Sequence, residues 1–178
     1  MLVYCIIYDS KLQIEIAALK SVFELVKIEF ENGFVGLCPM PGKYSSFDED
    51  FLQLVNALPT VVVTCATKSE MINCSAASLP EKLHTVGIKW FQIAVDDFQI
   101  PDELREKEWN SMMPILKTTV LSGGGVLFNC MGGCGRSGMF LMRLLLEMGW
   151  NSEGALERLR EFRPCAIETE QQKSWAFK

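Results

Sequence analysis

The sequence predicts an α/β fold in which helices flank a central, mostly parallel sheet. Short β-branched segments alternate with segments whose apolar residues recur at helical spacing. The 178 residues contain no internal repeat, low-complexity tract or linker rich in Pro, Gly or Ser. With 49% hydrophobic and 22% charged residues, the composition is that of a globular protein. We therefore expect residues 1–178 to form a single domain.

The N-terminal half is expected to alternate strands and helices. Residues 2–8 indicate a short strand, and residues 11–28 are compatible with a helix. Residues 34–37 predict a second strand. A helix is predicted between residues 47 and 58, and its apolar residues share one face: Phe51, Leu52, Val55 and Leu58. The β-branched residues 61–64 predict a buried strand.

The C-terminal half continues this alternation. Residues 90–95 predict a strand, followed by the acidic loop DDFQIPD. Asp102 opens a helix with apolar residues at helical spacing: Trp109, Met112, Met113, Leu116 and Val120. Residues 126–128 predict a strand, and the helix of residues 136–148 is apolar nearly all round, so it should be buried. A last helix follows residue 151 or 152, with Ala155, Leu156, Leu159 and Phe162 facing inward.

Charge and cysteine usage exclude several classes of function. A net charge of −5 provides no basic field for nucleic acid or an anionic membrane. Seven cysteines are an odd number without metal-finger spacing, which indicates reduced thiols. We expect no metal and no other cofactor. The N-terminus lacks a basic region typical of a signal peptide, and no apolar stretch approaches the roughly 20 residues of a spanning helix. We expect a cytoplasmic protein, with a nuclear location as the alternative.

The segment GVLFNCMGGCGRSG carries the chemistry. It predicts a buried strand that delivers Cys130 to a glycine-rich loop, and the loop runs directly into a helix. Backbone N–H groups and the helix N-terminus then converge on one anion, and a thiol held there should ionise readily. Arg136 can offer a two-pronged donor to phosphate, and Ser137 can donate to the sulfur. The predicted phosphate-binding residues are Met131, Gly132, Gly133, Cys134, Gly135 and Arg136.

Cys130-x5-Arg136-Ser137 resembles the signature of the protein tyrosine and dual-specificity phosphatases. The segments LCPMPGKY, VVVTCATKSEM, GIKWFQIAVDDFQIPD and RPCAIETEQQ are similar, in order and spacing, to kinase-associated phosphatase and related bacterial proteins. The resemblance covers roughly residues 34–178 and does not anchor the first 30. It implies the dual-specificity phosphatase fold, a cysteinyl-phosphate intermediate and a phosphoprotein substrate, with a kinase as one candidate.

The resemblance also implies roles for residues outside the loop. Asp97 matches the family's general acid. The alternatives are that Asp97 only stabilises a turn, or that Asp96 is the acid. Glu168 falls where the family has a water-positioning glutamine, and Gln172 matches a second one. Asn129 replaces the histidine that normally precedes the cysteine; it can keep a hydrogen bond to the backbone but carries no charge. We therefore expect weakened activity.

Several alternatives remain open at this level. Cys134 either packs or pairs with Cys130 on oxidation, and Cys65 is a second candidate for such a pair; otherwise Cys65 and Cys74 are packing or surface residues, and His84 lies at the surface. A pseudophosphatase that binds phosphate without turnover is the main alternative function. A rhodanese-like sulfurtransferase ranks last, because its loop is normally one residue shorter. MGGCG contains no lysine, which argues against phosphoinositide substrates.

Overall fold

The computed structural model describes residues 23–178. The strand expected at residues 2–8 and most of the helix expected at 11–28 lie outside these residues. Val26–Glu29 form strand β1, so a helix reaching residue 28 is wrong. β1 pairs antiparallel with β2 (Phe34–Pro39), and Phe30 N donates to Gly33 O at 2.7 Å in the connecting turn. This hairpin supplies the backbone partners that favour the extended conformation over the helix.

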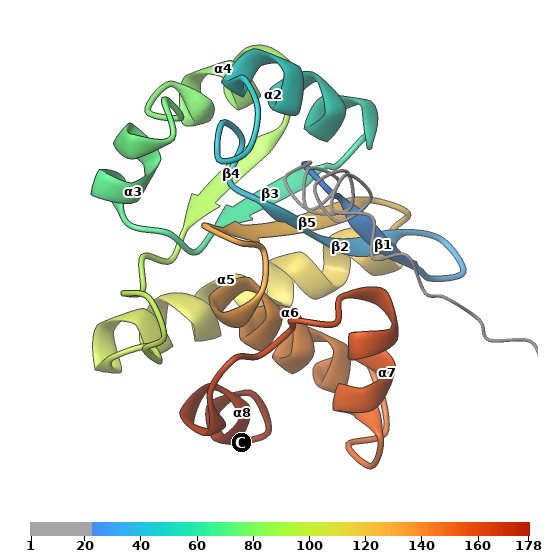
Figure 1. The fold of residues 1–178 in the computed structure, drawn as a ribbon. Coiled ribbons are helices and arrows are strands. Elements are labelled where there is room, and N and C mark those ends of the chain that lie inside the picture. The colour runs from blue at the N-terminus through green and yellow to red at the C-terminus, as the bar shows by residue number, and fades with distance from the viewer. Residues whose placement is uncertain (1–22) are drawn as a thin grey trace, which may run out of the picture.

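Five strands form one sheet in the order β1-β2-β5-β3-β4 (Figure 1). The remaining strands are β3 (Val61–Thr64), β4 (Lys89–Gln92) and β5 (Gly125–Cys130). All pairs except β1–β2 are parallel, as predicted. β5 lies between β2 and β3 and is buried along its whole length. The chain therefore presents the carboxyl end of its central strand, where Cys130 stands, at one edge of the sheet.

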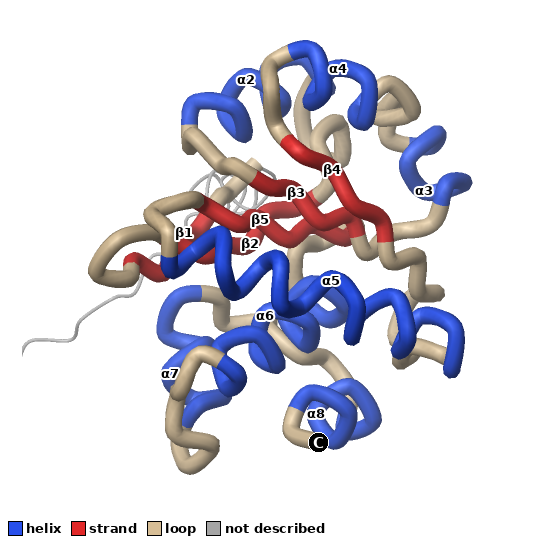
Figure 2. Tube along the Cα trace, turned by 180° about the vertical axis from the view of Figure 1, so that it is seen from behind, coloured by secondary structure: helices blue, strands red, loops and turns tan. Residues whose placement is uncertain are grey.

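Helices cover both faces of the sheet (Figures 1 and 2). One face carries α2 (Phe47–Asn56), α3 (Lys68–Asn73) and α4 (Leu79–Thr85). The other carries α5 (Glu103–Leu121), α6 (Gly135–Glu147), α7 (Ala155–Phe162) and α8 (Glu170–Ala176). The expected α/β class with a mostly parallel sheet is confirmed, and so is the burial of α6 on nearly every side.

Two predicted helix faces need correction. Leu52 of α2 is 59% exposed, Leu58 lies beyond the end of the helix and is 79% exposed, and the helix instead buries Asp50 and Leu54. The Asp50 carboxylate accepts hydrogen bonds from Gly42 N at 2.8 Å and from a serine hydroxyl, so α2 docks through its link to the preceding turn. In α7, Phe162 is exposed because the helix ends there, whereas Ala155, Leu156 and Leu159 are buried as predicted.

An aromatic cluster fixes α6 beneath β5. Trp109 of α5 packs on Phe128 and Phe140, and Trp175 of α8 contacts both Trp109 and Phe140 with ring centroids 6.2 and 4.9 Å apart. Such aromatic pairs contribute about 0.5–1.5 kcal/mol each beyond their buried area. The cluster thereby holds the strand, loop and helix that carry Cys130. Among residues 23–178, no helix is long and apolar enough to cross a bilayer.

Candidate active site

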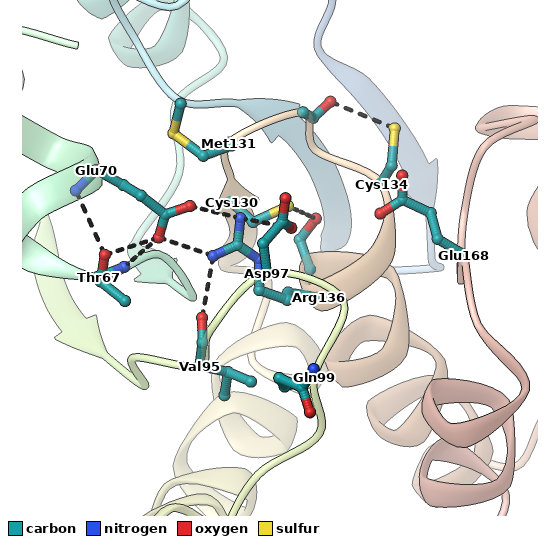
Figure 3. Close-up of polar contacts among 12 residues, drawn as sticks. Thr67, Glu70, Val95, Asp97, Gln99, Cys130, Met131, Cys134, Arg136 and Glu168 are labelled. Carbon is teal, nitrogen blue, oxygen red and sulfur yellow. Dashed lines mark hydrogen bonds and ion pairs between the residues drawn. The ribbon is translucent and has the colours of Figure 1, made fainter. Parts of the chain in front are cut away.

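Cys130 ends β5 and is buried at the start of the loop that leads into α6. Its Sγ lies 3.2 Å from the Oγ of Ser137 in the first turn of α6. We call residues 130–136 the Cys130 loop. The sequence-predicted thiol, hydroxyl and helix N-terminus therefore meet at one place (Figure 3).

The carbonyl groups of the Cys130 loop are bound on its outer side. Each of the four carbonyls from Met131 to Cys134 accepts a hydrogen bond from outside the loop or from the helix that follows. The donors are, in order, Met40 N (3.3 Å), Arg163 Nη2 (2.8 Å), Arg163 Nε (3.1 Å) and Gly138 N (2.9 Å). Because a trans peptide directs its C=O and N–H to opposite sides, the N–H groups of residues 132–135 turn the other way. Such a concave arrangement of N–H groups is typical of anion-binding sites.

Gly133 is the loop glycine that the geometry most clearly demands. Its φ is +68°, and a Cβ there would lie 2.5 Å from the carbonyl carbon and oxygen of Cys38 in β2. A side chain would thus meet both backbone strain and a backbone clash. The glycine lets the loop pass directly over the end of β2.

Arg136 is held by carboxylates on the side facing α3. Nη1 donates to Glu70 Oε2 at 2.8 Å and to Val95 O at 3.0 Å, and Nη2 donates to Glu70 Oε1 at 2.8 Å. Nη2 also pairs with Asp97 Oδ1 at 3.0 Å. The side chain is 1% exposed, and its Nε has no hydrogen-bond partner among residues 23–178. On the edge of the guanidinium formed by Nε and Nη2, Nε is therefore unpaired within the described residues and Nη2 is engaged by Asp97.

The electrostatics follow from this pairing. Burial raises the pKa of Glu70, but hydrogen bonds from Arg136 and from the backbone and hydroxyl of Thr67 outweigh it and lower the pKa overall. For Arg136, burial lowers the pKa, whereas the Glu70 hydrogen bonds and the nearby Cys130 and Asp97 raise it, and the net shift is upward. Arg136 is thus a permanently charged group whose position depends on Glu70.

Asp97 lies on the loop that follows β4, at the mouth of the site. Its side chain is 52% exposed, so it can meet both Arg136 and a bound substrate. Its neighbour Asp96 instead uses its carbonyl to accept the Gln99 N–H at 3.0 Å in the turn, and no ion pair joins it to Arg136. Phe98 holds the turn at a φ of +60°, which is unusual for a residue with a side chain. The geometry distinguishes Asp97 from Asp96.

Glu168 and Gln172 lie beside Gly135 on the opposite side of the loop. Burial raises the pKa of Glu168, with nearby Asp97 adding to the rise, while the Gly135 N–H bonded to the carboxylate and the charge of Arg136 lower it; the net shift is upward. Gln172 is buried, accepts from Glu168 N at 3.0 Å and donates to Gln99 O at 3.4 Å. Gln172 therefore links the Asp97 loop to the segment that bears Glu168.

Asn129 departs from the sequence-based expectation. It is fully buried, and neither its amide nitrogen nor its amide oxygen has a hydrogen-bond partner within the described part of the chain. The expected side-chain hydrogen bond to the backbone is therefore wrong. Along β5 the side chains alternate, so Asn129 lies on the face of Leu127, opposite Cys130.

The cysteines are arranged differently from the prediction. Cys134 forms a disulfide with Cys165, so it is neither a free packing thiol nor paired with Cys130. The expectation that all cysteines are reduced is therefore wrong. The two residues are adjacent because the segment after α7 lies against the Cys130 loop. Cys65 and Cys74 are free and buried. Burial, reinforced by the neighbouring Cys130, raises the pKa of Cys65 even though Arg136 acts in the opposite direction.

Sequence reasoning missed three residues that contact the loop: Glu70, Arg163 and Cys165. Only Glu70 had a local signal, because Thr67-x-x-Glu70 is a capping box and both of its reciprocal hydrogen bonds form at the start of α3. Arg163 and Cys165 depend on tertiary contacts. No group of three or more metal-binding side chains occurs within residues 23–178. His84 is exposed, as predicted.

Comparison with known proteins defines the class. No family model matches the sequence, and no curated protein matches it. Among solved structures, kinase associated phosphatase (KAP) with its catalytic-site cysteine substituted by serine is 23% identical with a TM-score of 0.74, covering 86% of this chain and 92% of that one. Tk-PTP in its active form is 25% identical with a TM-score of 0.63, covering 84% and 96%. A human tyrosine phosphatase-like serine/threonine/tyrosine-interacting protein is 14% identical with a TM-score of 0.64, covering 85% and 93%.

These neighbours share one fold. The chain has the fold of the protein tyrosine and dual-specificity phosphatases, and the resemblance drawn from its sequence is confirmed at that level.

Proposed function

We propose that the protein is a cysteine-dependent phosphatase acting on phosphoserine, phosphothreonine or phosphotyrosine in a phosphoprotein. The observation that carries the proposal is the convergence of three groups on one anion-binding loop. The Cys130 thiol stands at its start, the Arg136 guanidinium at its end, and the Asp97 carboxylate 3.0 Å from Arg136 Nη2. This is the set needed for nucleophile, phosphate clamp and proton donor.

In the first step the Cys130 thiolate attacks phosphorus and the bond from phosphorus to the ester oxygen breaks. Asp97, as the carboxylic acid, gives its proton to that oxygen, which matters most for a poor leaving group such as a serine alkoxide. In the second step water attacks the cysteinyl phosphate, Asp97 takes the water proton, and the S–P bond breaks to release inorganic phosphate. Ser137 donates to the departing sulfur from 3.2 Å.

Substrate binding requires a rearrangement at Arg136. Nη2 is shared with Asp97, and the guanidinium is almost fully buried. A phosphate that takes the Nε–Nη2 fork therefore displaces the Asp97 carboxylate, which can then stand beside the ester oxygen. Glu70 retains its two hydrogen bonds on the opposite edge and keeps the fork in place.

A second function, phosphate binding without turnover, is favoured by Glu168. Its carboxylate lies against Gly135 of the loop and places a negative charge beside the predicted phosphate site. In this reading Glu168, where the resembling family has glutamine, suppresses the hydrolytic step. Gln172, bonded to Glu168 N, would then serve to hold that segment in place.

The test is turnover of an aryl phosphate by wild type, Cys130→Ser and the matched control Cys65→Ser, which alters another buried thiol. We expect turnover in wild type and Cys65→Ser, and none in Cys130→Ser, which should still bind vanadate. Vanadate binding by wild type with no turnover would favour the binding module. Equal activity in all three proteins would exclude Cys130 as the nucleophile.

A further inference from the structure

We propose that Arg163 is a positioning residue that fixes the peptide orientation of the Cys130 loop, so that the loop N–H groups face phosphate. The inference deepens the proposed function and rests on it for its consequence. Arg163 is buried, its Nη2 donates to Gly132 O at 2.8 Å, and its Nε donates to Gly133 O at 3.1 Å. One side chain thus binds two successive carbonyls of the loop.

The two hydrogen bonds from Arg163 also determine which way the loop N–H groups point. A trans peptide directs its N–H away from its C=O, so the N–H groups of Gly133 and Cys134 point away from Arg163 and toward the concave side of the loop. Both carbonyls bind the same planar guanidinium, which fixes the two peptides relative to each other. The two residues that present these carbonyls are glycines, which pass readily between backbone conformations. The hydrogen bonds from Arg163 therefore restrict the backbone conformations of these two glycines.

Arg163 is itself fixed by hydrogen bonds outside the Cys130 loop. It directly follows α7, where its N–H donates to Leu159 O at 3.0 Å, and its Nη1 donates to Glu24 Oε2 at 2.8 Å. Two residues further on, Cys165 is joined to Cys134 of the loop. The short segment from Arg163 to Cys165 therefore holds three consecutive loop residues, from Gly132 to Cys134.

The charge of Arg163 acts in the same direction as its hydrogen bonds. A buried guanidinium behind the loop polarises the two peptides so that their N–H groups become stronger donors on the anion side. The N-terminus of α6 contributes the same sign of potential. A buried cation in this chain of net charge −5 thus lies directly behind the predicted anion site.

The experiment compares Arg163→Met and Arg163→Lys with the matched control Arg160→Met in the full chain. Arg160 lies in the last turn of α7 and also donates to two carbonyls, those of Ala166 and Ile167 at 3.1 and 2.9 Å, but within residues 23–178 no hydrogen bond joins it to the Cys130 loop. Measured are the amide ¹⁵N–¹H shifts of residues 132–135, the Kd for vanadate, and unfolding in urea as a check on folding.

We expect Arg163→Met to move the loop amide resonances and to weaken vanadate binding about tenfold to a hundredfold, while Arg160→Met changes neither. Arg163→Lys should recover only part of the affinity, because an ammonium keeps the charge but cannot bind both carbonyls in one plane. Unmoved loop resonances in Arg163→Met, or full recovery by lysine, would overturn the inference. Moved resonances and weakened vanadate binding in a protein without turnover would uphold the positioning role and reject the phosphatase.

Discussion

The Glu70–Arg136 contact gives the sharpest prediction about stability. In Glu70→Gln one side-chain oxygen can still accept a hydrogen bond from Arg136. The other oxygen is replaced by an NH2 group, so that a donor faces a donor. The two lost features are a charge-assisted hydrogen bond of 2.8 Å and the neutralising charge beside a guanidinium that is 1% exposed. Hydrogen bonds to charged groups contribute about 1.5–3 kcal/mol. Because Glu70 is itself 20% exposed and water can partly compensate, we expect a loss of roughly 2 kcal/mol, about thirtyfold in the unfolding equilibrium.

The pH dependence identifies the cause of that loss. The ordinary pKa of Glu70 is 4.5, and its folded pKa is lower. Stability contributed by a carboxylate with a lowered pKa is fully present above the unfolded value and is lost as pH falls through the folded one. The difference between wild type and Glu70→Gln should therefore be constant near neutral pH and should close at pH values well below 4.5.

The assay is urea unfolding across this pH range, with Glu161→Gln as the control for an exposed carboxylate. The same variants should also be tested with vanadate, since a less constrained Arg136 should bind it more weakly. A Glu70→Gln protein as stable as the control, or a stability difference that does not change with pH, would refute this account of Arg136.

Three further predictions follow from the site. Asn129→Leu should raise the free energy of unfolding in urea by about 1–3 kcal/mol, because it removes two buried polar atoms that have no partner within residues 23–178. The control Thr64→Val should lower it, because the Thr64 hydroxyl accepts a hydrogen bond from the Trp90 indole N–H at 2.9 Å. Destabilisation by Asn129→Leu would contradict this prediction. Reducing the Cys134–Cys165 disulfide with dithiothreitol should lower stability by roughly 3–4 kcal/mol for a 31-residue separation, and calorimetry that shows no change in Tm would argue against the bond. Asp97→Ala should slow hydrolysis of an alkyl phosphate far more than that of an activated aryl phosphate, and equal losses in kcat would reject the general acid.

The fold could be predicted where periodicity is strong and local. β3 and β5 each contain a run of three apolar residues, 61–63 and 126–128, and α5 and α6 repeat apolar residues over 19 and 13 residues. The helices α3, α4 and α8 were missed because six or seven residues give too short a period to recognise. β1 was misread because its conformation depends on pairing with β2 rather than on its own sequence.

The site divides in the same way. Cys130, Arg136 and Ser137 lie within eight residues of one another, so their spacing alone brings them together. Glu70 reaches Arg136 across 66 residues, and Arg163 reaches Gly132 across 31, so only the folded chain reveals these contacts. Strand alternation places Asn129 on the opposite face of the sheet from Cys130, but the sequence gave no sign that its buried amide has no hydrogen-bond partner within residues 23–178.

The most direct measurement of the central claim is a search for phosphate on Cys130 itself. Wild-type protein would be mixed with an aryl phosphate, quenched rapidly in acid, digested and measured by mass spectrometry, with Cys130→Ser and Cys65→Ser treated identically. The account predicts one added phosphoryl group on the peptide containing Cys130 in wild type and in Cys65→Ser, and none in Cys130→Ser. Release of the aryl alcohol with the phosphoryl group on another residue, or with the Cys130→Ser protein as fast as wild type, would contradict it.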